Sequence, residues 1–403
     1  MNSFGWVDFS KKDRDLARDI IASLETPGAL DELGIGVIRD GFADYFFPGT
    51  STVQTIPKYF FLVAYQLEEL SRNPSGNLEQ RLREMERQCS RRMWDSLSSD
   101  EQNSGSTGVF GSTLFKDKDS SSKDWVKRQP SSVYWNGLRK LGFLSSTNDN
   151  LSLADYLRIS KQRAQSSAES DDDLNAATKR FPNSSHPWRW KLPDDRDDWK
   201  SSPTTRLNLS EATFLAELIT ENLDDTLFAF LVCKRSLYPF GKMTFAEIGK
   251  NLQMPESLYR NWKLANDFSE FVKPAQIFFN YLLHNEEAET TWSEYRDNQE
   301  KLITLADSVK LDKVFELIKT PQHTKDFLIA LHDNYLNLDE AGLKELLTSR
   351  EKKLKGDARM KLGKEDSYHH YRDHWAGGLG FDYRFPDACR IIKDILIAEG
   401  KQP

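Results

Sequence analysis

Three charged residues lie close together near the start of the chain. Arg39, Asp40 and Asp44 fall in the segment DELGIGVIRDGFAD, on a helix that we expect from Val37 to Phe46. Asp40 and Asp44 are one helical turn apart, so their carboxylates can face the same point. Paired carboxylates can hold a divalent metal ion, and an arginine beside them can neutralise a phosphate. The two aspartates are therefore the candidate catalytic residues, although the sequence alone assigns no catalytic residue.

A hydroxyl-rich loop, PGTSTVQT, follows directly and ends just before another expected helix. Free backbone N–H groups at a helix N-terminus favour an anion, and hydroxyl or cationic side chains can complete such a site. The candidate residues for binding an anion or a partner are Arg39, Thr50, Ser51, Gln54 and Lys58. No GxxxxGK or GxGxxG fingerprint of a nucleotide site occurs. The alternative is a capped helix hairpin in which Arg39 pairs with Asp44 or with a loop carbonyl.

Two histidines in the segment HHYRDHW have the spacing of a metal site. His370 and His374 are four residues apart, as in many two-histidine zinc sites. However, Tyr371 occupies the position where a zincin has glutamate, and no third ligand is evident. The two histidines remain metal-binding candidates, and we assign no metal and no cofactor.

The segment MTFAEIGKNLQMPESLYRNWK resembles a helix-turn-helix. Its second helix would present Arg260 and Lys263 to a nucleic-acid groove. Gln253 stands where the turn often has glycine, and few cations are presented. A packed helical hairpin is the alternative.

A glycine-rich stretch, WAGGLGFDYRF, precedes the last expected helix. Glycines at 377, 378 and 380 permit backbone geometry that is closed to other residues. The pattern predicts a tight connection, with a ligand-binding loop as the alternative.

Composition limits the function classes. The chain has 403 residues, 55 lysines and arginines against 62 aspartates and glutamates, and a net charge of −7. This balance argues against a whole-surface affinity for nucleic acid or anionic membranes. Its three separated cysteines indicate free thiols in a reducing compartment. With no signal peptide and no apolar run long enough to cross a bilayer, we expect a cytoplasmic protein without a membrane partner.

Apolar periodicity predicts a mainly α, multi-helical fold with few or no short strands. The stretch 165–206 is rich in acidic residues, proline and tryptophan, which is typical of a surface linker. We therefore expect two helical domains, 1–164 and 207–403, joined by a long polar linker at 165–206. The sequence does not set the oligomeric state.

Several of these segments resemble a bacterial family of unknown function, domain of unknown function six-three-six-one. The matching segments are FGWVDFS at 4–10, DELGIGVIRDGFAD at 31–44, FPGTSTVQT at 47–55, PSSVYWNGLRKLG at 130–142, ANDFSEFVKPAQIFFNYLL at 265–283 and the DYRF region. Pro57-Lys58 and Phe385 depart from the family pattern, and the first departure removes an arginine from the loop. The resemblance implies no established activity, but it implies an association with helicase and nuclease genes of antiviral defence regions.

The leading hypothesis is a non-enzymatic helical subunit of a multi-protein bacterial system. It would contact another protein subunit, nucleic acid, or both, and ten tryptophans suit an interaction surface. The alternative is a metal-dependent phosphodiesterase or nuclease with its site around Arg39, Asp40 and Asp44.

Overall fold

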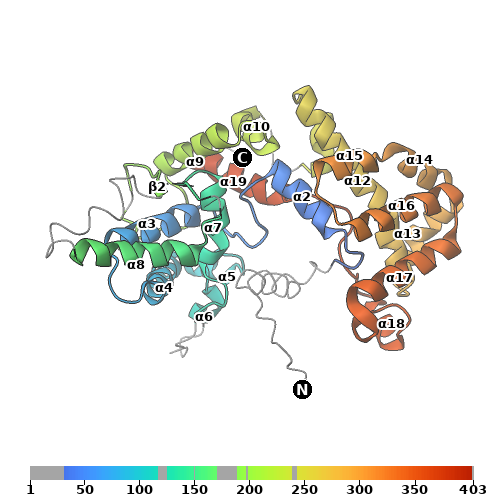
Figure 1. Cartoon of the computed structure of the whole chain (residues 1–403), viewed down its shortest axis with the longest axis horizontal. Helices are drawn as coiled ribbons and strands as arrows, with labels where there is room; N and C mark the ends of the chain where they lie inside the picture. The colour runs from blue at the N-terminus through green and yellow to red at the C-terminus, as the bar shows by residue number, and fades with distance from the viewer. Residues whose placement is uncertain are drawn as a thin grey trace, which may run out of the picture. The chain divides into compact units, whose positions relative to one another are not determined.

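The computed structural model describes residues 31–116, 125–148, 150–169, 188–196, 198–237 and 243–401. The chain divides into two compact units, each built from separate stretches of sequence (Figure 1). Unit 1 contains residues 1–42 and 245–383, and unit 2 contains residues 43–244 and 384–403. Helix α2 (Gly36–Phe46) contributes residues to both. The FGWVDFS segment lies outside the described residues.

Unit 2 is helical apart from two short strands. Its helices are α3 (Lys58–Arg72), α4 (Leu78–Ser96), α5 (Ser99–Asn103), α6 (Ser112–Lys116), α7 (Pro130–Lys140), α8 (Leu153–Glu169), α9 (Leu209–Asn222), α10 (Leu227–Cys233), the 3₁₀ helix η2 (Arg235–Leu237) and α19 (Phe385–Ala398). The strands are β1 (Leu144–Ser146) and β2 (Trp188–Trp190).

Helix α3 forms the centre of unit 2. Every residue from Lys58 to Leu67 is buried, so the helix is covered on all sides in its first half. Pro57 precedes it, at a position where a missing N–H costs nothing. Phe60 stacks on Phe143 with ring centroids 5.9 Å apart.

The predicted linker does not separate the two units. Strand β2 lies within it and pairs antiparallel with β1, with Leu144 opposite Trp190. Trp188 packs on Tyr156 at 4.6 Å between ring centroids, and the Trp190 indole donates a hydrogen bond to the Tyr156 hydroxyl. The tryptophans that suggested a draped surface segment therefore attach its second half to unit 2. Residues 170–187 and 197 of the segment lie outside the described part of the chain.

Unit 1 is built around the longest helix, α12. Its helices are α11 (Phe245–Asn251), α12 (Glu256–Tyr281), α13 (Glu286–Asp297), α14 (Glu300–Ser308), α15 (Leu311–Leu317), α16 (Gln322–Asn337), α17 (Glu340–Arg359) and α18 (Glu365–Tyr371). Phe268, Phe271 and Phe278 of α12 are fully buried, and Phe278 contacts Trp292 at 4.4 Å between ring centroids.

The glycine-rich stretch before α19 runs along α12 as a tight connection. The Phe381 N–H donates to Ser269 at 2.7 Å, and the Gly380 N–H donates to Gln276 at 2.8 Å. Asn280 exchanges hydrogen bonds with both backbone groups of Ala376. Polar side chains of α12 thus form hydrogen bonds with backbone groups of an irregular segment that pairs with no helix or strand.

The mainly α fold class is confirmed. Two strands of three residues each are the only β structure among the described residues. No helix in the described ranges has the length and apolar character that crossing a bilayer requires.

A buried carboxylate joins α4 to α7 in unit 2. Glu86 is 2% exposed, and its Oε1 atom accepts a hydrogen bond from the Ser131 N–H at 2.5 Å. Its Oε2 atom has no hydrogen-bond partner among the described residues. Burial raises the pKa of Glu86 to about 7, and the hydrogen bond from Ser131 offsets only part of this shift.

This shift makes stability depend on pH in a defined direction. Because the pKa of Glu86 is higher in the folded protein, the folded state binds more protons between pH 4.5 and about 7. The free energy of unfolding therefore falls as the pH rises through this window. We expect Glu86→Gln to remove this dependence and to stabilise the protein at pH 8 by up to about 3 kcal/mol.

Urea denaturation midpoints at pH 5, 6, 7 and 8 measure the effect. Glu84→Gln is the matched control, since Glu84 lies on the same helix, is exposed and pairs with Arg87. Equal pH profiles for the wild type and Glu86→Gln would contradict the assignment.

Candidate functional site

The loop that follows α2 in unit 2 is held by its own side chains. The Thr50 hydroxyl donates to the Phe47 carbonyl at 2.6 Å. The Gln54 amide donates to the Gly49 carbonyl at 3.0 Å and accepts from the Ser51 N–H at 3.1 Å. Thr50 and Gln54 are buried, so two candidate binding residues serve as internal braces of the loop.

Helix α7 clamps the far end of the same loop. The Tyr134 hydroxyl accepts hydrogen bonds from the N–H groups of Thr55 and Ile56, at 2.8 and 3.2 Å, and donates to the Ile56 carbonyl. At Gly137, a Cβ atom would lie only 2.7 Å from the Gly49 carbonyl oxygen. Glycine is therefore required there for the helix to approach the loop. The PSSVYWNGLRKLG segment and the FPGTSTVQT segment form one packed structure.

Two arginines, one just before α19 and one within it, donate hydrogen bonds to the backbone of the same loop. Arg384 donates to the Thr50 carbonyl at 3.0 Å and to the Asp44 carboxylate at 2.5 Å. Arg390 donates to the Gln54 carbonyl at 2.8 Å. Arg384 has a φ of 62°, a left-handed conformation that costs a non-glycine residue about 1 kcal/mol. The hydrogen bonds of Arg384 to Thr50 and Asp44 hold the residue in this unfavourable backbone conformation.

Lys58 lies inside unit 2 and is neutralised. Its ammonium is 2.8 and 2.7 Å from the two carboxylate oxygens of Glu211. The side chains are 1% and 0% exposed. Glu211 also accepts the Asn208 N–H in the capping box of α9. The ammonium that was a candidate for binding an anion thus already has an internal counter-ion.

The three charged residues of α2 take part in two separate ion pairs. Arg39 is 2.9 Å from its neighbour Asp40, whereas Asp44 pairs with Arg384. Neither pair corresponds to the Arg39–Asp44 pair of the hairpin alternative. Asp40 and Asp44 nevertheless remain 51% and 65% exposed, so their carboxylates are accessible to solvent.

The candidate histidines are stacked on the surface around the end of α18. The rings of His370 and His374 lie 5.3 Å apart and 4° from parallel, and His374 Nδ1 is 3.1 Å from the His370 carbonyl oxygen. Among the described residues, no group of three His, Cys, Asp or Glu side chains is arranged to hold a metal ion.

The candidate nucleic-acid residues face acidic neighbours on their own helix. Arg260 is 3.7 Å from Glu256, and Lys263 is 2.7 Å from Asp267. The helix that carries them, α12, packs against α11 through Trp262, whose indole donates to the Phe245 carbonyl. The two elements form a packed hairpin in which the cations are exposed but already paired with carboxylates.

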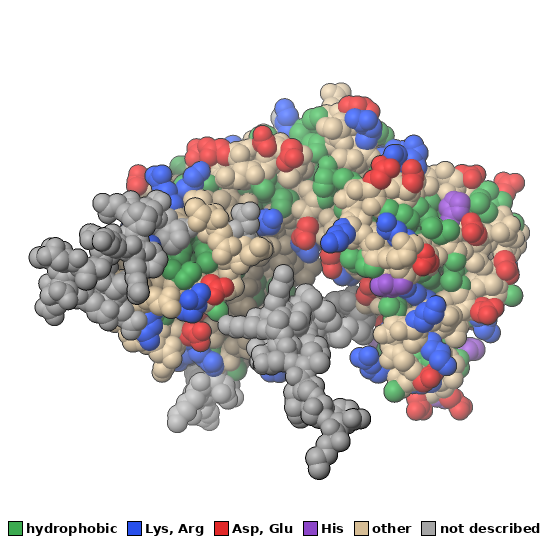
Figure 2. Space-filling view, viewed as in Figure 1, with side chains coloured by type: hydrophobic (Ala, Val, Ile, Leu, Met, Phe, Trp, Pro, Cys, Tyr) green, Lys and Arg blue, Asp and Glu red, His purple; other side chains and the backbone are tan. Residues whose placement is uncertain are grey.

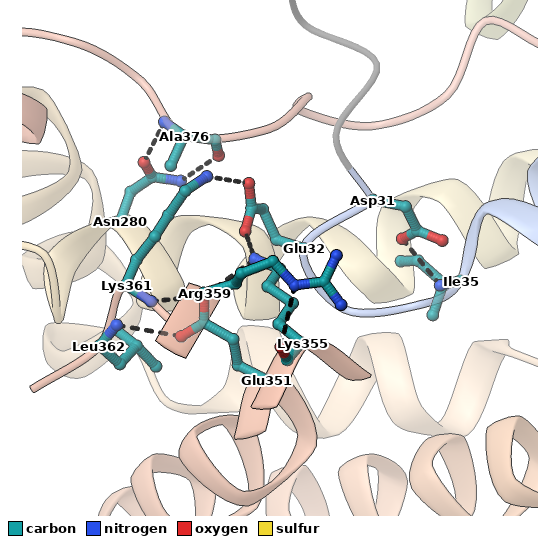
Figure 3. A network of polar contacts seen from close by, with 10 residues as sticks. All are labelled: Asp31, Glu32, Ile35, Asn280, Glu351, Lys355, Arg359, Lys361, Leu362 and Ala376. Carbon is teal, nitrogen blue, oxygen red and sulfur yellow. Dashed lines mark hydrogen bonds and ion pairs between the residues drawn. The ribbon is translucent and has the colours of Figure 1, made fainter. Parts of the chain in front are cut away.

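Sequence reasoning missed a buried charge network in unit 1 (Figure 3). Lys355 and Lys361 both point to Glu32, which is 5% exposed. Lys355 also contacts Glu351 at 2.8 Å, and Glu351 accepts the backbone N–H groups of Lys361 and Leu362. Burial lowers the pKa of Lys361, but the hydrogen bond and charge of Glu32 outweigh it and keep the pKa above its ordinary value. The network therefore holds Lys361 in the charged form.

Arg350 of α17 holds the first turn of DELGIGVIRDGFAD (residues 31–44), one of the segments that resemble the family and that we call the signature segments. It donates to the Leu33 carbonyl at 2.8 Å and the Gly34 carbonyl at 3.1 Å, and also to the His323 carbonyl and the Thr324 hydroxyl. Gly34 has a φ of 66°, and a Cβ atom there would lie 2.8 Å from the Arg350 guanidinium. The lysine-rich sequence of α17 was a visible signal, but nothing local identified its partners.

The buried pair Lys58–Glu211 should be intolerant of single changes. Lys58→Met leaves an uncompensated buried carboxylate, so we expect a loss of about 3–5 kcal/mol in the free energy of unfolding. The double variant Lys58→Met/Glu211→Leu should lose markedly less than the sum of the singles, because neither charge is left unpaired. Urea titration measures all three. Lys313→Met, which breaks an exposed pair with Glu316, is the control and should change stability by less than about 1 kcal/mol.

Arg350→Lys should release the first turn of the signature segment. Lysine keeps the charge but lacks the fork that reaches the carbonyls of Leu33 and Gly34 together. We expect faster amide hydrogen exchange over residues 31–38, and a destabilisation of about 2–4 kcal/mol. Arg359→Lys on the same helix is the control, since Arg359 is exposed. Unchanged exchange in Arg350→Lys would show that the turn is held by other contacts.

Comparison with known proteins matches part of the chain to a family whose description gives no activity. No curated protein and no solved structure matches the chain. The loop PGTSTVQT and the segment PSSVYWNGLRKLG that packs on it both lie in the N-terminal part of the sequence. That part, residues 1–196, matches the family described as "Family of unknown function (DUF6361)".

Proposed function

We propose that this chain is a non-enzymatic interaction subunit of a multi-protein system in the bacterial cytoplasm, of the kind that guards against foreign nucleic acid. One observation carries the proposal. The polar groups of the signature segments, and of Lys58 just after them, are engaged in intramolecular contacts, as the pairs Asp44–Arg384, Arg39–Asp40 and Lys58–Glu211 illustrate. An active site instead needs such groups directed toward a substrate.

Partner protein is favoured over nucleic acid as the principal contact. On the face shown in Figure 2, acidic and basic side chains are interspersed over the described residues, without an extended basic stripe. A stripe of unpaired cations is the usual electrostatic footprint of a nucleic-acid surface. Arg260 and Lys263 do not supply one, because acidic side chains accompany both.

The competing proposal is a metal-dependent phosphodiesterase. Its support is the exposure of Asp40 and Asp44, one helical turn apart on α2. In that case Mg²⁺ would be held between the two carboxylates and would displace their arginine partners.

Cleavage of single- and double-stranded DNA and RNA, in Mg²⁺ or Mn²⁺, separates the two proposals. We expect no cleavage above the buffer background for the wild type and an identical result for Asp44→Ala. Metal-dependent cleavage that disappears in both Asp40→Ala and Asp44→Ala would establish the enzyme instead.

The interaction proposal also makes a positive prediction. When the chain is co-expressed with the proteins encoded beside it, one of them should co-purify at a fixed stoichiometry. The complex should persist at 0.5 M NaCl and after nuclease treatment, since nucleic-acid bridging is lost under those conditions. Purification of the chain alone under all these conditions would contradict the proposal.

A further inference from the structure

Two histidines at the end of α18 lie side by side on the surface of unit 1. His370 and His374 are exposed, their ring centroids are 5.3 Å apart, and their ring planes are 4° from parallel. Arg372, which follows α18, keeps a helical φ of −54° and ψ of −49°. The two histidines are therefore one helical turn apart, on the same side of the chain.

A hydrogen bond determines which nitrogen of His374 is free. Its Nδ1 atom is 3.1 Å from the His370 carbonyl oxygen. Because a carbonyl oxygen can only accept, Nδ1 carries the hydrogen, and Nε2 of the neutral ring keeps its lone pair. Histidines that bind metal ions usually have this arrangement, with one ring nitrogen donating to a carbonyl and the other facing the metal.

The separation of the two rings suits a single tetrahedral ion. Two imidazole rings that bind one such ion at nitrogen–metal distances of about 2.0–2.1 Å have centroids about 5 Å apart. The centroids of His370 and His374 are already at that separation, 5.3 Å. Binding therefore requires no movement of the backbone.

The backbone that carries the histidines is held by the start of α13. Asn285 is 3% exposed, and its Nδ2 atom donates to the carbonyls of Tyr371 at 2.8 Å and His374 at 3.2 Å. The Glu286 N–H donates to the Arg372 carbonyl at 3.2 Å, and the carboxylate of Glu286 pairs with the Arg372 guanidinium at 2.8 Å. The geometry of the turn is thus set by the fold, which is what a preorganised binding site requires.

Two cationic side chains beside the pair are already neutralised. Arg372 has its counter-ion in Glu286. Lys361 lies over the ring of Tyr371, with its ammonium 4.7 Å from the ring centroid, and pairs with Glu32. Their charges therefore oppose the approach of a metal cation only weakly.

We propose that His370 and His374 bind one divalent transition-metal ion, through Nε2 of His374 and one ring nitrogen of His370, with water in the remaining positions. Imidazole suits Zn²⁺, Cu²⁺ and Ni²⁺, whereas Mg²⁺ and Ca²⁺ take oxygen ligands. The described residues supply no third side-chain ligand, so the ion keeps open positions, unlike the four-ligand structural sites of zinc proteins. This site goes beyond the proposed interaction function, which requires no metal.

Calorimetric titration of the full chain, after treatment with a chelator, tests the site with ZnCl₂, NiCl₂, CuCl₂ and MgCl₂. We expect one equivalent of each transition metal to bind, Cu²⁺ most tightly, and no binding of Mg²⁺. His370→Gln and His374→Gln should each weaken Zn²⁺ binding at least about tenfold. His369→Gln is the matched control, since His369 is adjacent and exposed but belongs to no such pair, and it should bind Zn²⁺ as the wild type does.

Thermal unfolding gives a second measurement. Saturating Zn²⁺ should raise the melting temperature of the wild type and of His369→Gln but not that of His374→Gln, because only a bound ion stabilises the folded state. Without metal, all three should melt together, since the altered side chains are exposed. Absence of Zn²⁺ binding, or equal binding by the wild type and both His370→Gln and His374→Gln, would overturn the proposal. An equal loss of affinity in His369→Gln would also overturn it, because the ion would then be bound by the histidine-rich surface in general.

Discussion

Irregular backbone can be buried only if its N–H and C=O groups find partners, and both units depend on this constraint. In unit 2 the loop from Gly49 to Ile56 is satisfied by Tyr134, by Arg384 just before α19 and by Arg390 within it. In unit 1 the turn at Leu33 and Gly34 is satisfied by Arg350. Each unsatisfied carbonyl would cost about 1–3 kcal/mol. The signature segments are therefore places where distant side chains replace the regular hydrogen bonding of helices.

The buried charges follow from the same constraint. A lysine inside a helical core is tolerable only beside a carboxylate, and Lys58 has that partner in Glu211, 153 residues away in sequence. Such a pair adds little net stability compared with an apolar pair of similar volume. The pair disfavours any packing of α3 against α9 that separates the two charges, because each charge would then be buried without a counter-ion. The pair accordingly selects one register between these helices.

The helices could be predicted from sequence because their signals are local. Pro57 and Pro130 mark helix starts, and apolar periodicity marks α4 and the helices after 207. The partners of charged residues could not be predicted, since Arg350 and Leu33 are 317 residues apart. The units differ from the predicted domains for a related reason. Composition identifies polar stretches, but it does not show that Trp188 packs on Tyr156 or that unit 1 is assembled from two separate stretches.

Polar residues in this protein fall into two physical groups with different implications. Those of the signature loop, such as Gln54 and Tyr134, have their hydrogen-bonding capacity used within the fold, so the need to fold suffices to explain them. A few others, such as the Trp292 indole N–H and Glu86 Oε2, are buried without a hydrogen-bond partner among the described residues, and each costs stability as it stands. A group that stabilises the fold needs no ligand to account for it, whereas a buried group without a partner calls for a water, an ion or a ligand. The contacts of the signature loop are therefore accounted for by folding alone.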